Sequence, residues 1–331
     1  MKNVPIRVDG RFRLGDMLGS GSYGVVYHAW NIINDDEFAV KLEPLINNSS
    51  SLEHKYNTLK QLQGGVGIPR AGWFGREVTY DALVLDLLGP SLHDIFLMRN
   101  RKFNLCTILN IGDQLLSSLE HIHSHNYVYG DIKPQNVLIG RGASKNSIFI
   151  VDFGVAKEYW SSTTQAHMSF HQVFASINNH LGVVPGHCDD LELLVYMLIY
   201  FICGSLPWLT SDHEKLSSSS ILACKVDTTI EVLCLGIPSE ITTMLIYSRN
   251  LAFSEDPDYT YLRSLLHDEA PSYFIYKSTI QGPSTNMPLK FLVCCMSRDQ
   301  GTAQGLVQAA QQTTASSTLL TTSGRKMRMT Y

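Results

Sequence analysis

Two groups of residues in this 331-residue chain have types and spacings suited to chemistry on phosphates. The first is a Gly-x-Gly-x-x-Gly pattern at Gly19, Gly21 and Gly24, followed by Lys41. Because glycine has no Cβ atom, the backbone N–H groups of such a loop can approach phosphate oxygens. A lysine on the following strand can place its ammonium group beside the same oxygens.

The second group lies about ninety residues further along the chain. It consists of Asp131, Lys133 and Asn136, with Asp152 sixteen residues after Asn136. An aspartate can accept a hydroxyl proton, a lysine can steady a transferred phosphoryl group, and an asparagine with an aspartate can hold Mg²⁺. These positions, in this order and downstream of the glycine pattern, indicate the protein kinase arrangement.

Two other interpretations of the glycine pattern are weaker. In a dinucleotide-dependent oxidoreductase, a helix begins at the glycines and an acidic residue follows roughly 20 positions later. Here residues 25–27 read Val-Val-Tyr, which favours a strand, and Ala-Val-Lys follows at 39–41. A glycine-rich hairpin beside an ordinary surface lysine would not explain the second group.

Strands and helices must position these residues. The β-rich runs predict strands over residues 12–18, 25–30, 37–42, 82–87, 137–140 and 148–151. The spacing of apolar residues predicts helices over 51–63, 105–124 and 190–203, the last with a buried core segment at 193–203. We therefore predict an α+β fold with a small β-rich lobe carrying one helix (1–88) and a larger, mostly helical lobe (89–270).

The composition supports a folded protein and limits its partners. Apolar residues make up 44% of the chain and charged residues 17%, which suits a buried core. Residues 1–270 hold 20 basic and 29 acidic side chains, whereas 271–331 hold 6 and 1. The net charge of −4 argues against nucleic-acid binding, and the longest apolar run is too short to span a membrane.

The seven cysteines are scattered without a Cys-x-x-Cys pair, so we expect reduced thiols and a cytoplasmic or nuclear protein. We also expect the chain to act as a monomer. Residues 300–324 carry no charge and are rich in Thr, Ser, Gln and Ala. We therefore expect residues 271–331 to form a low-complexity, basic, disordered tail.

Six further stretches resemble the casein kinase 1 family. They are Gln-Gly-Gly-Val-Gly-Ile-Pro at 63–69, Leu-Leu-Gly-Pro-Ser-Leu at 87–92, Ala-Ser-Ile-Asn at 175–178, Gly-Ser-Leu-Pro-Trp at 204–208, Ile-Glu-Val-Leu-Cys at 230–234 and Pro-Asp-Tyr at 257–259. The resemblance covers residues 12–266 in collinear order. It implies a two-lobed kinase that uses ATP and Mg²⁺ to phosphorylate Ser or Thr in protein substrates.

The resemblance also implies roles for individual residues. Those implied to bind the nucleotide are Leu18, Gly19, Ser20, Gly21, Ser22, Tyr23, Gly24, Val25, Val26, Lys41, Asp86 and Leu88. Lys41 would contact the α- and β-phosphates, and the backbone of Asp86 and Leu88 would meet the adenine, with Leu85 as gatekeeper.

For the reaction itself, the resemblance implies Asp131 as the catalytic base and Lys133 as its assistant. Asn136 belongs to the same loop and would hold Mg²⁺ together with Asp152. Asp190 would brace the catalytic loop.

The most consequential departure from the family is at residue 55. Casein kinase 1 relatives have Leu-Glu-His-Glu-Tyr, whose second carboxylate pairs with the strand lysine, but here Lys55 takes that place. Glu53 lies about 200° away around the helix and cannot replace it. Two ammonium groups about 4 Å apart would repel by roughly 4 kcal/mol at an effective dielectric near 20, so we expect Lys55 to swing to solvent or toward the phosphates and Lys41 to be less well positioned.

Three further departures concern the loops around the site. Tyr129-Gly130 replaces His-Arg before Asp131, which removes a guanidinium and adds backbone freedom. The segment from 152 to 178 is several residues short, through a natural deletion or a misassigned exon. His187 and Cys188 replace two family arginines that read acidic substrates, and Lys225 is interpreted as a solvated surface lysine or a remnant of that anion site.

These departures leave two hypotheses for function. The first is a protein serine/threonine kinase of reduced activity, and the alternative is a pseudokinase that binds nucleotide or partners without catalysis.

Overall fold

The computed structural model describes residues 7–21, 24–45, 51–159, 173–209 and 216–268. All described residues lie in one compact unit, Met1–Ser284. The expected tail at 271–331 and most of the short segment before residue 178, namely 160–172, lie outside the described residues.

Strands dominate the chain up to residue 86, and helices dominate after it. The strands are β1 (Arg7–Val8), β2 (Phe12–Ser20), β3 (Val25–Asn31), β4 (Glu37–Pro44), β5 (Ala71–Arg76), β6 (Tyr80–Asp86), β7 (Tyr127–Val128), β8 (Val137–Ile139), β9 (Ile148–Ile150) and β10 (Lys157–Glu158). The helices are α1 (Ser51–Gln61), α2 (Leu92–Met98), α3 (Leu105–Ser124), α4 (Ile177–His180), α5 (His187–Cys203), α6 (Ser218–Asp227), α7 (Ile230–Leu233), α8 (Ser239–Asn250) and α9 (Tyr259–Asp268), with short 3₁₀ turns η1 (Pro134–Asn136) and η2 (Gly142–Ser144).

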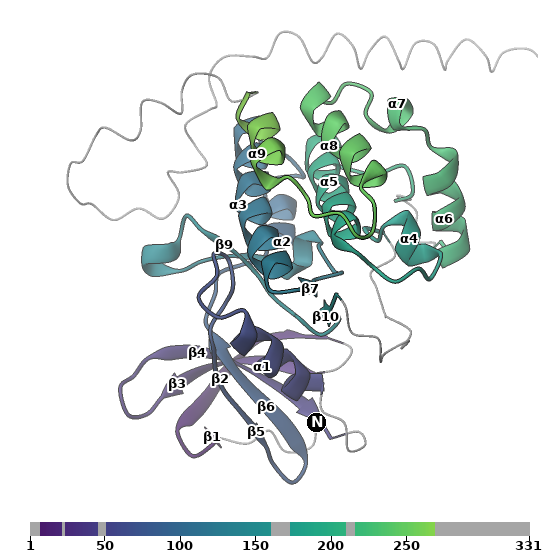
Figure 1. Cartoon of the computed structure of the whole chain (residues 1–331). Coiled ribbons are helices and arrows are strands. Elements are labelled where there is room, and N and C mark those ends of the chain that lie inside the picture. Colours follow the sequence, from purple (N-terminus) through teal and green to yellow (C-terminus); the bar gives the residue numbers. More distant parts are fainter. Residues whose placement is uncertain (1–6, 22–23, 46–50, 160–172, 210–215, 269–331) are drawn as a thin grey trace, which may run out of the picture. The chain divides into compact units, whose positions relative to one another are not determined.

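A single antiparallel sheet with strand order β1-β2-β3-β4-β6-β5 forms the β-rich lobe (Figure 1). Side chains alternate between the two faces of a strand, so Val40 and Leu42 of β4 enter the core inside the curled sheet. Lys41 and Glu43 therefore share the opposite face. In the ladder with β6, Lys41 lies across from Leu83 and Glu43 from Asp81.

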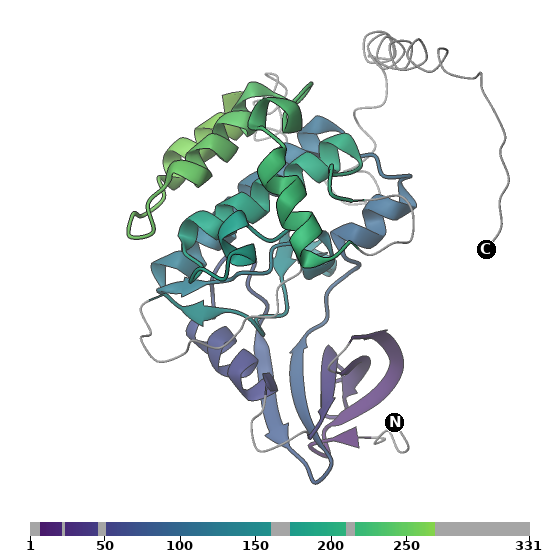
Figure 2. The same ribbon diagram turned by 90° about the vertical axis from the view of Figure 1, so that its right-hand side faces the viewer.

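The α1 helix packs against β5 and β6 on one side of the sheet (Figures 1 and 2). It buries Leu52, Leu59 and Leu62, and the ring of Tyr56 lies 5.9 Å from that of Phe74. Lys55 stands three residues after Leu52 and four before Leu59, so it belongs to the same face of the helix. The sequence of α1 thus directs a lysine toward the sheet.

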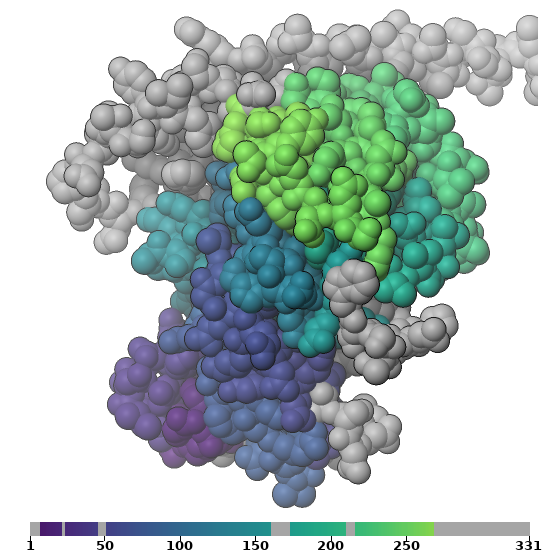
Figure 3. Space-filling model, in the orientation of Figure 1, coloured from purple at the N-terminus to yellow at the C-terminus, as the bar shows by residue number. Residues whose placement is uncertain are grey.

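The helical lobe is built around α5 and α3. Every residue of α5 from His187 to Phe201 is buried, which confirms the predicted core helix at 193–203. Leu115, Leu119 and Ile122 of α3 are fully buried beside it. The α9 helix, yellow-green in Figure 3, packs on α3 and forms part of the surface of this lobe.

Two short antiparallel ribbons hold the loops that carry residues 129–136 and 151–156. The β8–β9 ribbon pairs Val137 with Ile150, so it fixes the chain just after residue 136 and just before residue 152. The β7–β10 ribbon pairs Val128 with Lys157 and ties the start of the catalytic loop to the segment after residue 152.

The expected α+β fold with a β-rich and a helical lobe is confirmed, and each predicted strand and helix is present with ends shifted by a few residues. The sequence did not predict β5, because Gly72 and Gly75 interrupt its β-branched and aromatic pattern. Within the described ranges, no helix is both long and apolar enough to cross a membrane.

Candidate active site

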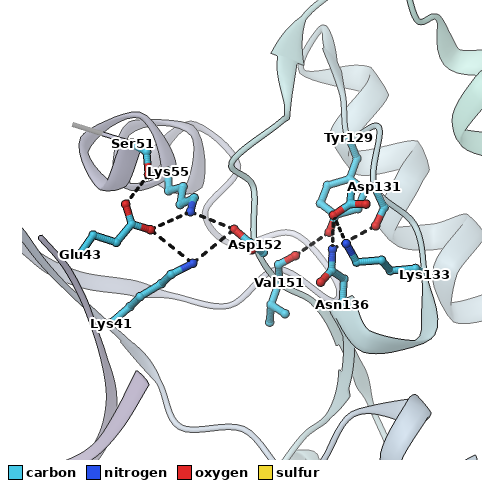
Figure 4. Close-up of polar contacts among 10 residues, drawn as sticks. All are labelled: Lys41, Glu43, Ser51, Lys55, Tyr129, Asp131, Lys133, Asn136, Val151 and Asp152. Atoms are coloured by element: carbon cyan, nitrogen blue, oxygen red, sulfur yellow. Dashed lines mark hydrogen bonds and ion pairs between the residues drawn. The ribbon is translucent and has the colours of Figure 1, made fainter. Parts of the chain in front are cut away.

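Four charged side chains from three segments meet in what we call the charge ring: Lys41 and Glu43 of β4, Lys55 of α1, and Asp152 (Figure 4). The Nζ of Lys55 lies 3.2 Å from Oε1 of Glu43 and 3.1 Å from Oδ1 of Asp152. The Nζ of Lys41 lies 3.5 Å and 3.6 Å from the same two oxygens. Positive and negative groups alternate around the ring, so each ammonium has two carboxylates beside it.

Of the two positions expected for Lys55, the structure excludes one. Only 5% of the residue is exposed, so the expectation that it swings to solvent is wrong. The repulsion between Lys55 and Lys41 is offset because Glu43 and Asp152 lie between them. Glu43 also accepts a hydrogen bond from the hydroxyl of Ser51, at the start of α1.

The expectation that Lys41 lacks a carboxylate partner is likewise wrong, because Glu43 supplies one from its own strand. Glu53, as predicted, does not take this role. Its side chain is 54% exposed and lies 3.9 Å from Arg76.

Two glycines make room for the charge ring. A Cβ atom on Gly154 would lie 2.6 Å from Cε of Lys55, and one on Gly24 would lie 2.3 Å from the carbonyl oxygen of Leu42 and 2.7 Å from Cγ of Glu43. Gly24 is thus required by packing against β4. Its role differs from that of Gly19 and Gly21, whose Cβ atoms would meet no described atom within 4 Å.

Burial and the neighbouring charges shift the pKa values of three members of the charge ring. Burial opposes the charged form of Lys55, but Asp152 and Glu43 outweigh it and raise the pKa of this lysine. Burial, together with the ammonium of Lys55, lowers the pKa of Lys41. Burial alone would raise the pKa of Asp152, but Lys41 and Lys55 lower it, so this carboxylate stays ionised.

A second constellation, the Asp131 cluster, consists of Asp131, Lys133 and Asn136 (Figure 4). Oδ2 of Asp131 accepts hydrogen bonds from Nζ of Lys133 at 2.6 Å and from Nδ2 of Asn136 at 2.6 Å. Nδ2 of Asn136 also donates to the backbone carbonyl of Asp131 at 3.1 Å. Burial raises the pKa of Asp131 against the opposing effect of Lys133.

Asp190 holds the backbone that carries this cluster. It is fully buried and accepts the N–H groups of Tyr129 at 2.7 Å and Gly130 at 2.6 Å. Nε2 of His123 donates to the same carboxylate at 3.0 Å, and the hydroxyl of Tyr259 donates to the other nitrogen of that ring at 2.5 Å. This is the bracing contact expected of Asp190.

Tyr129 links the Asp131 cluster to the charge ring. Its hydroxyl donates to the carbonyl of Val151 at 2.5 Å, directly before Asp152, and its ring packs edge-on against Phe153 at 5.2 Å. Burial raises the pKa of Tyr129 well above its usual range, so the hydroxyl remains a donor.

The backbone at residues 130 and 152 adopts left-handed conformations. Gly130 has φ of 76°, which glycine adopts without the strain that a Cβ atom brings. The expected gain in backbone freedom at Gly130 is offset, because Asp190 holds its N–H. Asp152 has φ of 62°, an unusual value for a non-glycine residue, and its contacts with Lys41 and Lys55 hold it there.

The two lobes therefore bring together Lys41, Asp152 and the Asp131 cluster, the five side chains for which sequence reasoning implied roles in phosphoryl transfer. A family model for the protein kinase domain matches residues 12–179, just over half of the chain. The chain belongs to the protein kinase family. Kinases of this family use ATP with divalent metal ions and act on protein substrates.

The other nucleotide-binding predictions fall at the edge of this kinase site. Leu18, Gly19, Ser20 and Gly21 close β2, Val25 and Val26 open β3, and Ser22 and Tyr23 lie outside the described residues. The N–H of Asp86 donates to the carbonyl of Arg70 at 3.1 Å, so only the carbonyl of Asp86 could meet the base. The N–H of Leu88 has no partner among the described residues.

A cavity of about 350 Å³ is lined by Asp36, Glu37, Phe38, Arg70, Leu87 and Arg141. None of these residues belongs to the charge ring or to the Asp131 cluster. We therefore place the chemistry of the kinase at the two clusters and not in this cavity.

The structure also differs from the sequence interpretation at Lys225. Lys225 is 1% exposed, not solvated: its Nζ donates to the carbonyl of Ala175 at 2.5 Å and lies 5.2 Å and 5.1 Å from the ring centres of Tyr196 and Trp208. Burial lowers the pKa of Lys225 to about 7. The aromatic rings and the carbonyl replace the water that a surface lysine would contact.

His187 and Cys188, which stand at two arginine positions of the resembling family, also point inward. His187 is 3% exposed and stacks between the rings of His123 and Tyr159, at 4.1 Å and 4.2 Å. Burial lowers the pKa of His187 to about 4. Neither position presents a positive charge to solvent.

Sequence reasoning missed Glu43 and the hydroxyl of Tyr129. A signal for Glu43 was present, because it stands two residues after Lys41 and so shares its strand face. No local signal marks the Tyr129–Val151 contact, which depends on how the two ribbons pack.

Proposed function

We propose that the chain is a protein serine/threonine kinase of the casein kinase 1 type, which uses ATP with Mg²⁺. The observation that carries the proposal is the joint placement of the Asp131 cluster and Lys41 with Asp152. The six sequence stretches that resemble casein kinase 1 support the finer assignment.

In this proposal Asp131 accepts the proton of a substrate hydroxyl as its oxygen bonds to the γ-phosphorus and the bond to the β-phosphate oxygen breaks. Burial has raised the pKa of this carboxyl, which makes it a better proton acceptor. Lys133, 2.6 Å from Asp131, offsets negative charge on the phosphoryl group in transfer, and Lys41 does so at the other phosphates.

Asn136 and Asp152 fit a Mg²⁺ ion whose remaining ligands would be phosphate oxygens. Nδ2 of Asn136 is committed to Asp131, which leaves the amide oxygen for a cation, and the side chain of Asp152 is 44% exposed. Mg²⁺ in such sites takes one or two carboxylates and substrate phosphates, so the lack of a larger acidic cluster in the described ranges does not count against it. When bound, the ion would neutralise charge on the phosphates.

The substrates are not expected to be acidic or pre-phosphorylated peptides. His187, Cys188 and Lys225 are buried, so the basic surface that the family resemblance would offer is missing at these positions. Residues 1–270, with 20 basic and 29 acidic side chains, would repel such peptides.

Incubation of the purified chain with labelled ATP, Mg²⁺ and a basic protein that carries exposed Ser and Thr residues tests the proposal. We expect phosphate incorporation into Ser or Thr, reduced by about 10²–10⁴-fold in Asp131→Asn. Asp227→Asn, at an exposed position in α6, is the matched control. Incorporation equal in the wild type and in Asp131→Asn would contradict the proposal.

A pseudokinase is the second candidate, and one observation favours it. Oδ1 of Asp152, proposed to hold the metal, already has ammonium groups at 3.1 Å and 3.6 Å. A cation at this oxygen would meet the charge of both lysines. Nucleotide binding without incorporation in the same experiment would support this candidate.

A further inference from the structure

Lys55, unlike Lys41, has no role in the proposed reaction. It comes from α1 and reaches the proposed metal-binding carboxylate, with Nζ 3.1 Å from Oδ1 of Asp152. The ammonium therefore lies beside an oxygen on which a divalent cation would depend.

The position of this ammonium is fixed before any ligand arrives. The side chain of Lys55 is 7% exposed, Glu43 and Asp152 hold its Nζ, and the absence of a Cβ atom at Gly154 admits its Cε. A charge held in place costs little reorganisation when an anion binds.

The formal charge of the ring also matters. Two lysines and two carboxylates sum to zero, whereas a glutamate at position 55 would leave the ring at −2. The difference of two charges is that of one divalent cation. Since Lys41 contacts the same two oxygens as Lys55, both ammonium groups border the same space (Figure 4).

We propose that Lys55 supplies the positive charge that one divalent cation would otherwise supply, so that the chain binds the phosphates of a nucleoside diphosphate or triphosphate without a metal ion. This inference rests on the proposed nucleotide-binding role of the same site. It concerns binding and not turnover, for which the metal remains part of the proposed reaction.

Calorimetric titration of the full chain with ADP, in Mg²⁺ and in EDTA, tests the inference without measuring activity. We expect the two dissociation constants to agree within about threefold. Lys55→Met should weaken ADP binding in EDTA by about tenfold, while Lys55→Arg should bind within about threefold of wild type. Lys60→Met, at an exposed lysine of the same helix, should leave binding unchanged.

Circular dichroism and thermal midpoints establish that each variant is folded, and the wild-type comparison stands without any variant. ADP binding by the wild type that is lost in EDTA would overturn the inference and leave the proposed kinase activity intact. Equal binding of Lys55→Met and wild type in EDTA would also overturn it. No ADP binding under either condition would overturn both proposals.

Discussion

The Asp131 cluster and the charge ring lie in one active site but are held in different ways. The first stands on a loop whose backbone N–H groups are bound by Asp190, and its members lie within six residues of one another. The second joins side chains of β4, α1 and the segment after β9, and only charge pairs connect them.

This difference explains what each region tolerates. A loop held through its backbone accepts different side chains, so Tyr129 and Gly130 can stand where the family resemblance implies His-Arg while Asp190 still holds their N–H groups. A ring held by charges accepts a reversal at one corner when the other corners keep the sum balanced, so Lys55 replaces a usual glutamate. The predictions below test that contrast.

Asp190→Asn should have the largest effect, because an amide cannot accept both N–H groups and the bond from His123. We expect the free energy of unfolding to fall by about 2–4 kcal/mol, measured by urea denaturation. Asp227→Asn, at an exposed site, is the control. A loss of unfolding free energy no larger than that of the control would show that the loop does not depend on the bonds from its backbone to Asp190.

Glu43→Gln should come next, because it leaves two buried ammonium groups with Asp152 alone. We expect a loss of about 1–3 kcal/mol in the free energy of unfolding. In a Lys55→Met background the same substitution should cost less, with a coupling energy of about 1–2 kcal/mol in the double-mutant cycle. Strict additivity would show that Glu43 and Lys55 do not interact.

Gly130→Ala should have a smaller effect, because it forces a Cβ atom into a left-handed conformation. The expected loss is about 1–2 kcal/mol, with a parallel fall in phosphoryl transfer as Asp131 shifts. Gly72→Ala in β5 is the control, since its Cβ would make ordinary contact with Val84 at 3.6 Å. An unchanged Gly130→Ala protein would mean that the loop relaxes to another conformation.

Tyr129→Phe should have the smallest effect. It removes one hydrogen bond, to the carbonyl of Val151, and leaves the packing on Phe153 in place. We expect a loss of about 1 kcal/mol by thermal or urea unfolding, and Tyr261→Phe, at a partly exposed tyrosine, should change nothing. A loss much above that figure would mean that this bond holds the two clusters together.

Much of the fold was open to prediction from the sequence. The strands carrying Val40 and Val84, and the helices carrying Leu119 and Leu198, have strong periodic patterns, and the residues of the Asp131 cluster stand close together in the chain. The burial of Lys55 was not predicted, because Glu43, the carboxylate that balances it, lies twelve residues earlier in another element. The burial of Lys225 was not predicted, because the aromatic rings around it, those of Tyr196 and Trp208, come from helix α5 and the turn after it.

The pairing of Glu43 with Lys55 also bears on how mutations here are judged. A substitution at either residue alters the electroneutrality of four positions, so its effect depends on which charges the other three carry. Inspection of residue 55 alone would class the chain as inactive, and inspection of Lys41 alone would class it as intact. Only the combination of charges around the ring is informative, so a substitution at one position should be judged by the net charge that it leaves on all four.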